Sequence, residues 1–166
     1  MRYMNHVQAV VLAAAVIAGN VVAHAQTKAR PAPAKPAVQA LPQLAVFKTP
    51  TCGCCASWVQ HMEKNGFTAK VTNMPDLSAV KRQNGVTQRL ESCHTTLVGG
   101  YVIEGHVPAE DVRRLLKEKP AGIAGLAAPG MPPGSPGMDL ANSPAYQIIA
   151  FDKAGKTSVY ATHAGK

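Results

Sequence analysis

Three cysteines fall within four positions of the stretch KTPTCGCCASWVQHMEKNGF (48–67). They follow LAVFKT (44–49), a short apolar run suited to a strand. After them the pattern becomes helical, because Cys55, Val59 and Met62 recur at i, i+4 and i+7. A strand, a turn that carries thiols and a helix in immediate succession restrict the chain to folds that place cysteines at a helix N-terminus.

The pattern continues as alternating strands and helices to about residue 120. The predicted elements are strands at 44–49 and 67–74, helices at 54–65, 77–84 and 109–119, and two strands or a bent hairpin within 95–105. Asp76 is expected to cap the second helix, and Gly85 to end it. This β-α-β-α-β-β-α order is thioredoxin-like. It predicts an α/β domain over 44–120, with a central mixed sheet flanked by helices.

The C-terminal part differs in composition from that domain. Residues 121–144 are dense in Gly and Pro, which predicts a loop without a regular element. Residues 145–162 alternate in polarity on both sides of DKAGK, the pattern of a β-hairpin. We therefore expect 145–166 to form a hairpin that extends the sheet or packs on it.

The N-terminus has the pattern of a secretory signal peptide over residues 1–25. MRYMNH precedes an apolar run, and Ala23 to Ala25 form an A-x-A cleavage signal. The next segment, 26–43, is rich in Ala and Pro and reads as a flexible tether. These features predict a periplasmic protein without a membrane span after signal cleavage. The net charge of +8 is scattered and not interleaved with aromatic residues, so nucleic acid is not an expected partner.

The chain has four cysteines, and their spacing argues against two simple disulfides. Cys54 and Cys55 are neighbours, so their Cα atoms lie ~3.8 Å apart, below the usual disulfide range. At the start of a helix, both thiols are expected to have lowered pKa values. Cys52 and Cys55 have the C-x-x-C spacing of a thiol–disulfide oxidoreductase. The surplus thiol favours a metal site instead, since thiolates bind soft metals.

The fourth cysteine stands in SCHTT, directly before the third predicted strand. In thioredoxin-like folds this segment faces the N-terminus of the first helix and usually carries a proline. Here Cys93 and His94 occupy the place, and they add a sulfur and an imidazole to the three thiols. The alternative is that Cys93 only packs and His94 lies on the surface.

Four motifs together carry a resemblance to a known family. TPTCGCCASWVQHMEKNGF, SCHT, VIEGHVPAEDVRRLL and GLAAPGMPPGSPGM resemble the CopG-type periplasmic copper-resistance proteins, a thioredoxin-like family long grouped as of unknown function. The resemblance covers about 44–140. It implies a Cu(I) site, with one or more ions, whose ligands are Cys52, Cys54, Cys55, Cys93 and His94. A cysteine-bridged cluster of several copper ions with redox activity, as in a copper oxidoreductase, is a related version.

Residues near the cluster receive weaker predictions. Met131 and Met138 lie in the Gly/Pro loop without an obvious core to fill, and thioethers favour Cu(I). We expect that loop to fold over the thiols, the alternative being a free segment. His106 and Trp58 are candidates for the edge of the site. The expected partners are copper ions and other periplasmic copper carriers or exporters. A thiol–disulfide oxidoreductase and a structural zinc module remain as alternatives.

Overall fold

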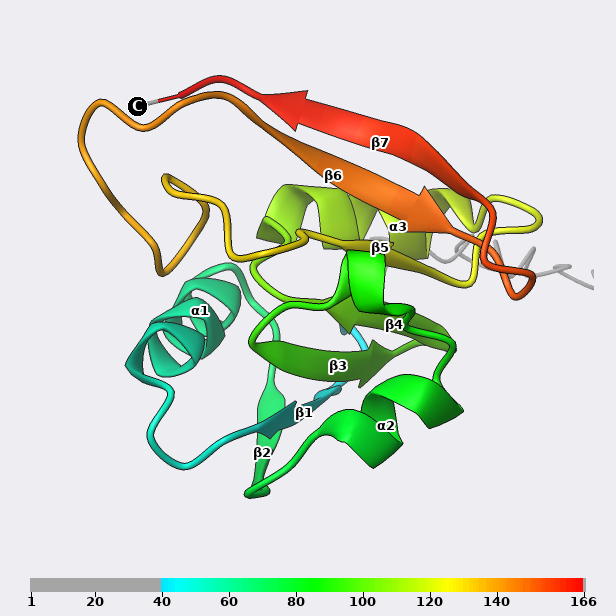
Figure 1. The fold of residues 1–166 in the computed structure, drawn as a ribbon, viewed down its shortest axis with the longest axis horizontal. Coiled ribbons are helices and arrows are strands. Elements are labelled where there is room, and N and C mark those ends of the chain that lie inside the picture. The colour runs from blue at the N-terminus through cyan, green and yellow to red at the C-terminus, as the bar shows by residue number, and fades with distance from the viewer. Residues whose placement is uncertain (1–39, 166) are drawn as a thin grey trace, which may run out of the picture. The chain divides into compact units, whose positions relative to one another are not determined.

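A seven-stranded mixed sheet forms the centre of the structure, a computed structural model that describes residues 40–165 (Figure 1). Its strands are β1 (Leu44–Lys48), β2 (Ala69–Asn73), β3 (His94–Val98), β4 (Tyr101–Glu104), β5 (Gly125–Ala127), β6 (Tyr146–Phe151) and β7 (Thr157–His163). The helices are α1 (Gly53–Lys64), α2 (Ser78–Gln83) and α3 (Ala109–Glu118), with a short 3-10 helix, η1 (Gln88–Leu90). The predicted α/β class and the order of elements through α3 are confirmed.

The strands lie in the order β2-β1-β3-β4-β5-β6-β7. The pairs β1–β2 and β4–β5 are parallel, and the other neighbours are antiparallel. A two-glycine turn joins β3 to β4, because Gly99 and Gly100 adopt φ values of 56° and 86° that favour glycine. The register of this hairpin sets Thr95 opposite Glu104, and both side chains therefore lie on one face of the sheet.

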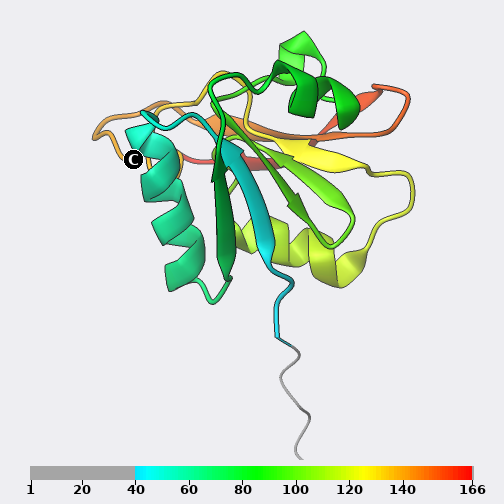
Figure 2. The same ribbon diagram turned by 90° about the horizontal axis from the view of Figure 1, so that it is seen from below.

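Helices cover both faces of the sheet: α1 and α3 lie on one face, and α2 lies on the other (Figure 2). The main core joins the sheet to α1 and α3 through side chains such as Trp58, Met62, Val112 and Leu115. A smaller cluster lies beneath η1 on the other face and contains Val86, Leu90, Val102, Ala127 and Phe151. Within residues 40–165, no helix combines the length and the apolar character that crossing a bilayer needs.

The first helix spans Gly53–Lys64, one residue earlier at each end than the predicted 54–65. The sulfur of Cys52, at the N-cap position, accepts a hydrogen bond from the backbone N–H of Cys55 at 3.3 Å. The buried face is formed by Cys55, Trp58, Val59 and Met62, at the spacing of one helical stripe. The helix stops at Asn65, and Gly66 follows with φ of 83°, which satisfies the last carbonyls in the left-handed conformation.

The structure differs from the sequence prediction at the second helix and in the C-terminal loop. The second helix begins at Ser78 with Leu77 at its N-cap, and Asp76 accepts a hydrogen bond from the Ser78 N–H at 2.9 Å without being the N-cap residue. The sequence predicts no regular element in 121–144, yet this segment contains β5, which pairs with β4 and β6. Its small residues allow that pairing, since a Cβ at Gly125 would lie 2.2 Å from the carbonyl oxygen of Val102. The predicted hairpin is confirmed as β6 and β7, and it extends the sheet through β5. The predicted signal peptide, and the predicted tether up to residue 39, fall outside the described residues.

Candidate metal centre

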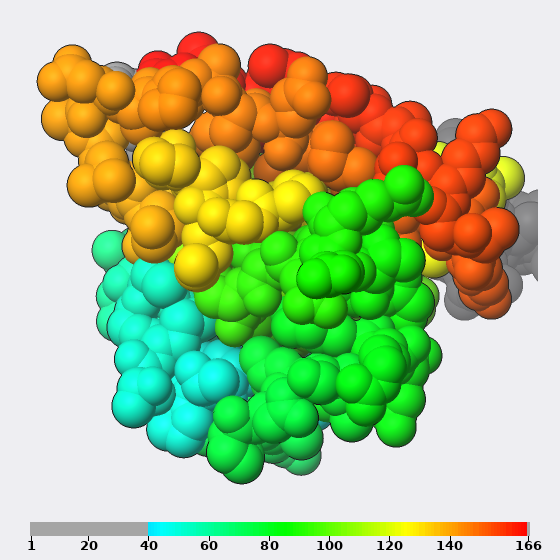
Figure 3. All heavy atoms as spheres, viewed as in Figure 1, coloured from blue at the N-terminus to red at the C-terminus, as the bar shows by residue number. Residues whose placement is uncertain are grey.

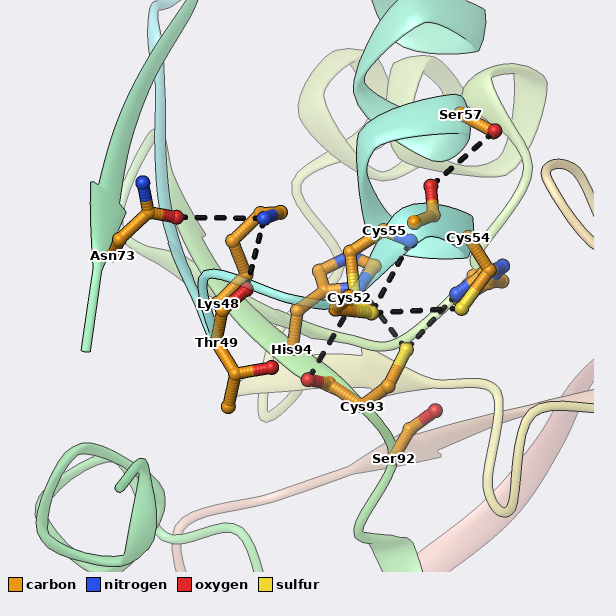
Figure 4. The surroundings of a disulfide bond; sticks show 12 residues. Lys48, Thr49, Cys52, Cys54, Cys55, Ser57, Asn73, Ser92, Cys93 and His94 are labelled. Atoms are coloured by element: carbon orange, nitrogen blue, oxygen red, sulfur yellow. Dashed lines mark hydrogen bonds between the residues drawn. A yellow bond between two sulfur atoms is a disulfide. The ribbon is translucent and has the colours of Figure 1, made fainter. Parts of the chain in front are cut away.

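The four cysteines meet where the N-terminus of α1 faces the start of β3 (Figure 4). Cys52 caps α1, and Cys54 and Cys55 stand in its first turn. Cys93 directly precedes β3, whose first residue is His94. The sulfur atoms of the four cysteines all lie within 4.8 Å of one another. The structure thus brings together the cysteines that the sequence predicted to form one site.

Two of these cysteines are bonded to each other. Cys52 and Cys55 form a disulfide whose Cα atoms lie 5.3 Å apart, the C-x-x-C pairing of the oxidoreductase alternative. Cys54 and Cys93 are free and half-buried. The Cys54 sulfur lies 3.5 Å from that of Cys52. In this form the site contains one disulfide and two thiols, and only reduction of the disulfide would give four thiols.

A second group of ligand atoms overlaps the first. Cys55, Cys93, His94 and His106 also bring their ligand atoms within 4.8 Å of one another. The two groups share Cys55 and Cys93, so these sulfurs lie between the thiol side and the imidazole side of the site. Since a thiolate can bridge two ions, the arrangement has donors for more than one metal ion.

His106 contributes an imidazole from the turn between β4 and α3. Its Nε2 atom lies 2.9 Å from the sulfur of Cys93, and its Nδ1 atom lies 2.8 Å from the carbonyl oxygen of Pro136. A carbonyl only accepts, so Nδ1 carries the proton and Nε2 keeps its lone pair toward the sulfur in the neutral ring. Burial lowers the pKa of His106, which favours that neutral, ligating form. From the sequence, this residue is predicted to lie only at the edge of the site.

His94 is fully buried beside the cluster, not on the surface. Its ring centroid lies 4.4 Å from that of Trp58 and 5.3 Å from that of His106. Its Nδ1 atom is 3.4 Å from the Cys93 sulfur, and its Nε2 atom has no hydrogen-bond partner among residues 40–165. Burial, aided by the nearby positive charges, holds its pKa well below the usual value. The imidazole is therefore neutral and able to bind a metal.

The environment of Cys93 opposes ionisation in the metal-free protein. Burial, together with the neighbouring Cys54, raises the pKa of the Cys93 thiol to about 12. A metal that binds this sulfur must displace the thiol proton. A soft cation that binds Cys93 would therefore have to convert this thiol into a thiolate.

Trp58 packs beside the site, as the sequence predicted for its position. Its side chain is fully buried, and Nε1 donates to the carbonyl oxygen of Val107 at 2.9 Å. This hydrogen bond ties α1 to the turn that carries His106. The indole is therefore held in place, and the His94 ring packs against it.

The Gly/Pro loop folds against the N-terminus of α1, where its orange spheres meet the cyan helix (Figure 3). Gly137, with φ of 85°, lies so close that a Cβ there would be 2.7 Å from the carbonyl oxygen of Cys54. Pro136 supplies the carbonyl that holds His106. Met131 is exposed at 37%, and Met138 is half-buried. Their predicted role as ligands stays a prediction.

Comparison with known proteins shows the family to which the chain belongs. A family model described as a protein of unknown function, DUF411, matches residues 90–138. Two solved structures, named copper resistance protein CopG form 1 and form 2, are each 40% identical to the chain, with a TM-score of 0.70. The first match covers 75% of this chain and 99% of the other, and the second covers 74% and 98%. The chain belongs to the CopG family. No curated protein matches it.

The likeness to CopG reaches further than the sequence resemblance did. That resemblance rested on about 44–140, whereas a match over 75% of the chain is longer than this stretch. The family model alone spans Cys93, His94 and His106 together with most of the Gly/Pro loop. The DUF411 match thus includes both imidazoles of the centre.

Proposed function

We propose that this CopG family member binds copper, as Cu(I), in the periplasm and serves copper resistance or homeostasis. The ligands would be the sulfurs of Cys52, Cys54, Cys55 and Cys93 and the imidazoles of His94 and His106. The observation that carries the proposal is the convergence of these four sulfurs within 4.8 Å beside two neutral imidazoles. The names of the two similar structures, both copper resistance proteins, support the choice of metal.

The donor set fits Cu(I) in its chemistry. Thiolate and imidazole are soft to intermediate donors, and they select copper or zinc over magnesium or calcium. Zinc sites of the structural kind use four ligands around one ion. Here six donors form two overlapping groups that share Cys55 and Cys93. This overlap favours several ions bridged by sulfur, as Cu(I) thiolates allow, over a single tetrahedral zinc.

The protein's own residues prepare the site for such an ion. The Pro136 carbonyl orients the His106 ring, and the Trp58 ring packs against that of His94. Burial lowers the pKa of both imidazoles and so favours their neutral form, in which one ring nitrogen of each keeps a lone pair for a metal. The Gly/Pro loop packs against the first turn of α1 through Gly137. Bound copper would supply the soft acceptor that the four sulfurs and two nitrogens together coordinate.

A thiol–disulfide oxidoreductase is the second candidate, and one observation favours it. Cys52 and Cys55 form the disulfide expected of a C-x-x-C pair at a helix N-terminus. Cys54 separates the two functions, because a dithiol switch does not need it whereas a copper centre does. Its sulfur lies 3.5 Å from that of Cys52 and enters the four-sulfur group.

The experiment titrates Cu(I) into the reduced protein without oxygen and compares it with Cys54→Ser. Copper binding that falls sharply in the variant, while Cys52 and Cys55 still exchange disulfides, supports the copper centre. Copper binding that is unchanged in the variant, together with rapid reduction of disulfide substrates by both proteins, supports the oxidoreductase. Cell fractionation with an antibody to the chain tests the periplasmic location separately.

A further inference from the structure

A buried ion pair lies directly behind the metal centre, and no ligand role uses it. Lys81, on α2, donates through Nζ to Oε1 of Glu104, at the end of β4. The two side chains are 8% and 0% exposed. Both residues lie on the face of the sheet opposite to α1, so neither belongs to the cluster itself.

The pair holds the segment that carries Cys93 and His94 at both of its ends. On one side, Glu104 Oε1 accepts the backbone N–H of Ser92 at 2.7 Å, and Lys81 Nζ donates to the Ser92 carbonyl oxygen at 2.9 Å. On the other side, the hydroxyl of Thr95 donates to Glu104 Oε2 at 2.7 Å. Lys81 Nζ also lies 3.4 Å from that hydroxyl oxygen. Both neighbours of the Cys93–His94 pair are thus fixed by one set of charges.

The same contacts tie this segment to the one that carries His106. Glu104 stands two residues before His106, with only Gly105 between them. The N–H of Gly105 donates to the carbonyl oxygen of His94 at 2.9 Å. Gly105 has φ of 68°, and a Cβ there would lie 2.2 Å from the Ser92 hydroxyl oxygen. The two segments therefore approach closely at the point where His106 meets Cys93.

Stability alone does not account for keeping such a pair. Taking two charges out of water costs free energy, and a well-packed apolar pair of similar size is often as stable or more stable. Burial raises the pKa of Glu104, with the Lys81 hydrogen bond opposing that shift, which reflects the same cost. Thioredoxin-like folds usually hold this segment with a proline. This chain has none between Ser92 and Thr95.

We propose that Lys81 and Glu104 are positioning residues of the metal centre, which hold Cys93 and His94 in register with His106 and the cysteines of α1. The proposal rests on the proposed copper site for its functional consequence. Its structural part, the fixing of the 92–95 segment, concerns the metal-free protein and is measured there.

The test uses the full chain with the double change Lys81→Met, Glu104→Leu, which removes both charges and keeps similar volume. We expect a melting temperature close to that of the wild type, but faster hydrogen exchange at the Ser92 amide and faster alkylation of Cys93. Cu(I) affinity is expected to fall about 10- to 100-fold, as when outer partners of metal ligands are lost. Glu104→Gln, which keeps the size and one acceptor oxygen, should show smaller changes in the same direction.

Asp111→Asn is the matched control. Asp111 is a buried carboxylate on α3 that pairs with Arg114 and His163, away from the centre. Its loss should lower the melting temperature without changing Ser92 exchange, Cys93 alkylation or Cu(I) affinity. If the double variant does not fold, the same measurements on Glu104→Gln decide whether the pair has the positioning role.

The outcomes separate the two proposals. Wild-type rates of Ser92 exchange and Cys93 alkylation in the folded charge-free variant, with wild-type Cu(I) affinity, would overturn the positioning role. A wild-type protein that binds no Cu(I) would overturn the proposed function instead. In that case the exchange and alkylation rates of the metal-free variants still decide whether the ion pair fixes the segment.

Discussion

The Nε2 atom of His106 lies 2.9 Å from the sulfur of Cys93, while the opposite ring nitrogen is bound to the carbonyl oxygen of Pro136. The loop thus fixes the tautomer of the histidine, and the histidine points its lone pair at the cysteine. This contact joins three separate parts of the chain: the start of β3, the turn before α3 and the Gly/Pro loop. It makes His106 a ligand candidate equal to His94.

Replacing His106 with Asn should weaken Cu(I) binding by about tenfold or more, or lower the number of ions bound, because a neutral nitrogen donor is lost. Competition with a Cu(I) chelator measures the affinity, and metal analysis gives the stoichiometry. His163→Gln is the control, since that histidine lies on β7 and pairs with Asp111. Equal losses in both variants would show that His106 acts only through folding.

Oxidation should switch copper binding off in large part. In the disulfide form, Cys52 and Cys55 have no thiolate to offer, and only Cys54 and Cys93 remain as sulfur donors. We expect the oxidised protein to bind less Cu(I) than the reduced protein, with recovery after reduction and removal of the reductant. Thiol titration before each copper titration verifies the redox state. Equal stoichiometry in both states would exclude this disulfide from the centre.

Copper binding through Cys93 should strengthen as the pH rises. The pKa of this thiol is raised to about 12, so the free protein keeps the proton that metal binding must release. Each proton released raises the apparent affinity about tenfold per pH unit below that pKa. Cu(I) affinity measured between about pH 6 and about pH 8 should therefore climb, while the neutral His94 and His106 add little.

The Cys93→Ser variant provides the check on that pH slope. Its affinity should be lower, and the slope should decrease by about one proton because that thiol no longer ionises on binding. The fold should be kept, since Cys93 is only half-buried. An identical stoichiometry and slope in the variant would mean that Cys93 only packs beside the site.

The methionines of the loop are tested by Met131→Leu, Met138→Leu, which keeps size and apolarity and removes only the thioethers. If one of them serves as a weak soft ligand, Cu(I) affinity should fall and air oxidation of the loaded protein should become faster. Gly137 already packs on the first turn of α1, so the loop itself should stay in place. No change in either measurement would remove both methionines from the centre.

The sequence allowed the sulfur side of the site to be predicted because local signals placed it. A strand, a C-x-x-C turn and a helix fix Cys52 and Cys55, and the next antiparallel strand must bring Cys93 alongside. The burial of Lys81 could not be predicted in this way, because the sequence KRQ in a short polar helix is typical of a solvent-exposed face. Its partner Glu104 is distant in the chain, and only the tertiary packing reveals the pair.

Two other features could not be predicted from the local sequence pattern either. β5 has only three residues, Gly125–Ala127, in a Gly/Pro-rich context, and its neighbours β4 and β6 supply the hydrogen bonds that define it. The role of His106 depends on the Pro136 carbonyl, which lies 30 residues away in the chain. Long-range contacts of this kind follow from topology, not from propensity or periodicity.

The most direct test is the metal content of the full-length gene product, isolated from the cell envelope without oxygen. We predict copper as the main metal, at more than one ion per chain, with sulfur ligands detected by X-ray absorption. The Cys54→Ser and Cys93→Ser variants isolated in the same way should contain less. Zinc at one ion per chain, or no metal in protein whose four thiols are reduced, would contradict this prediction.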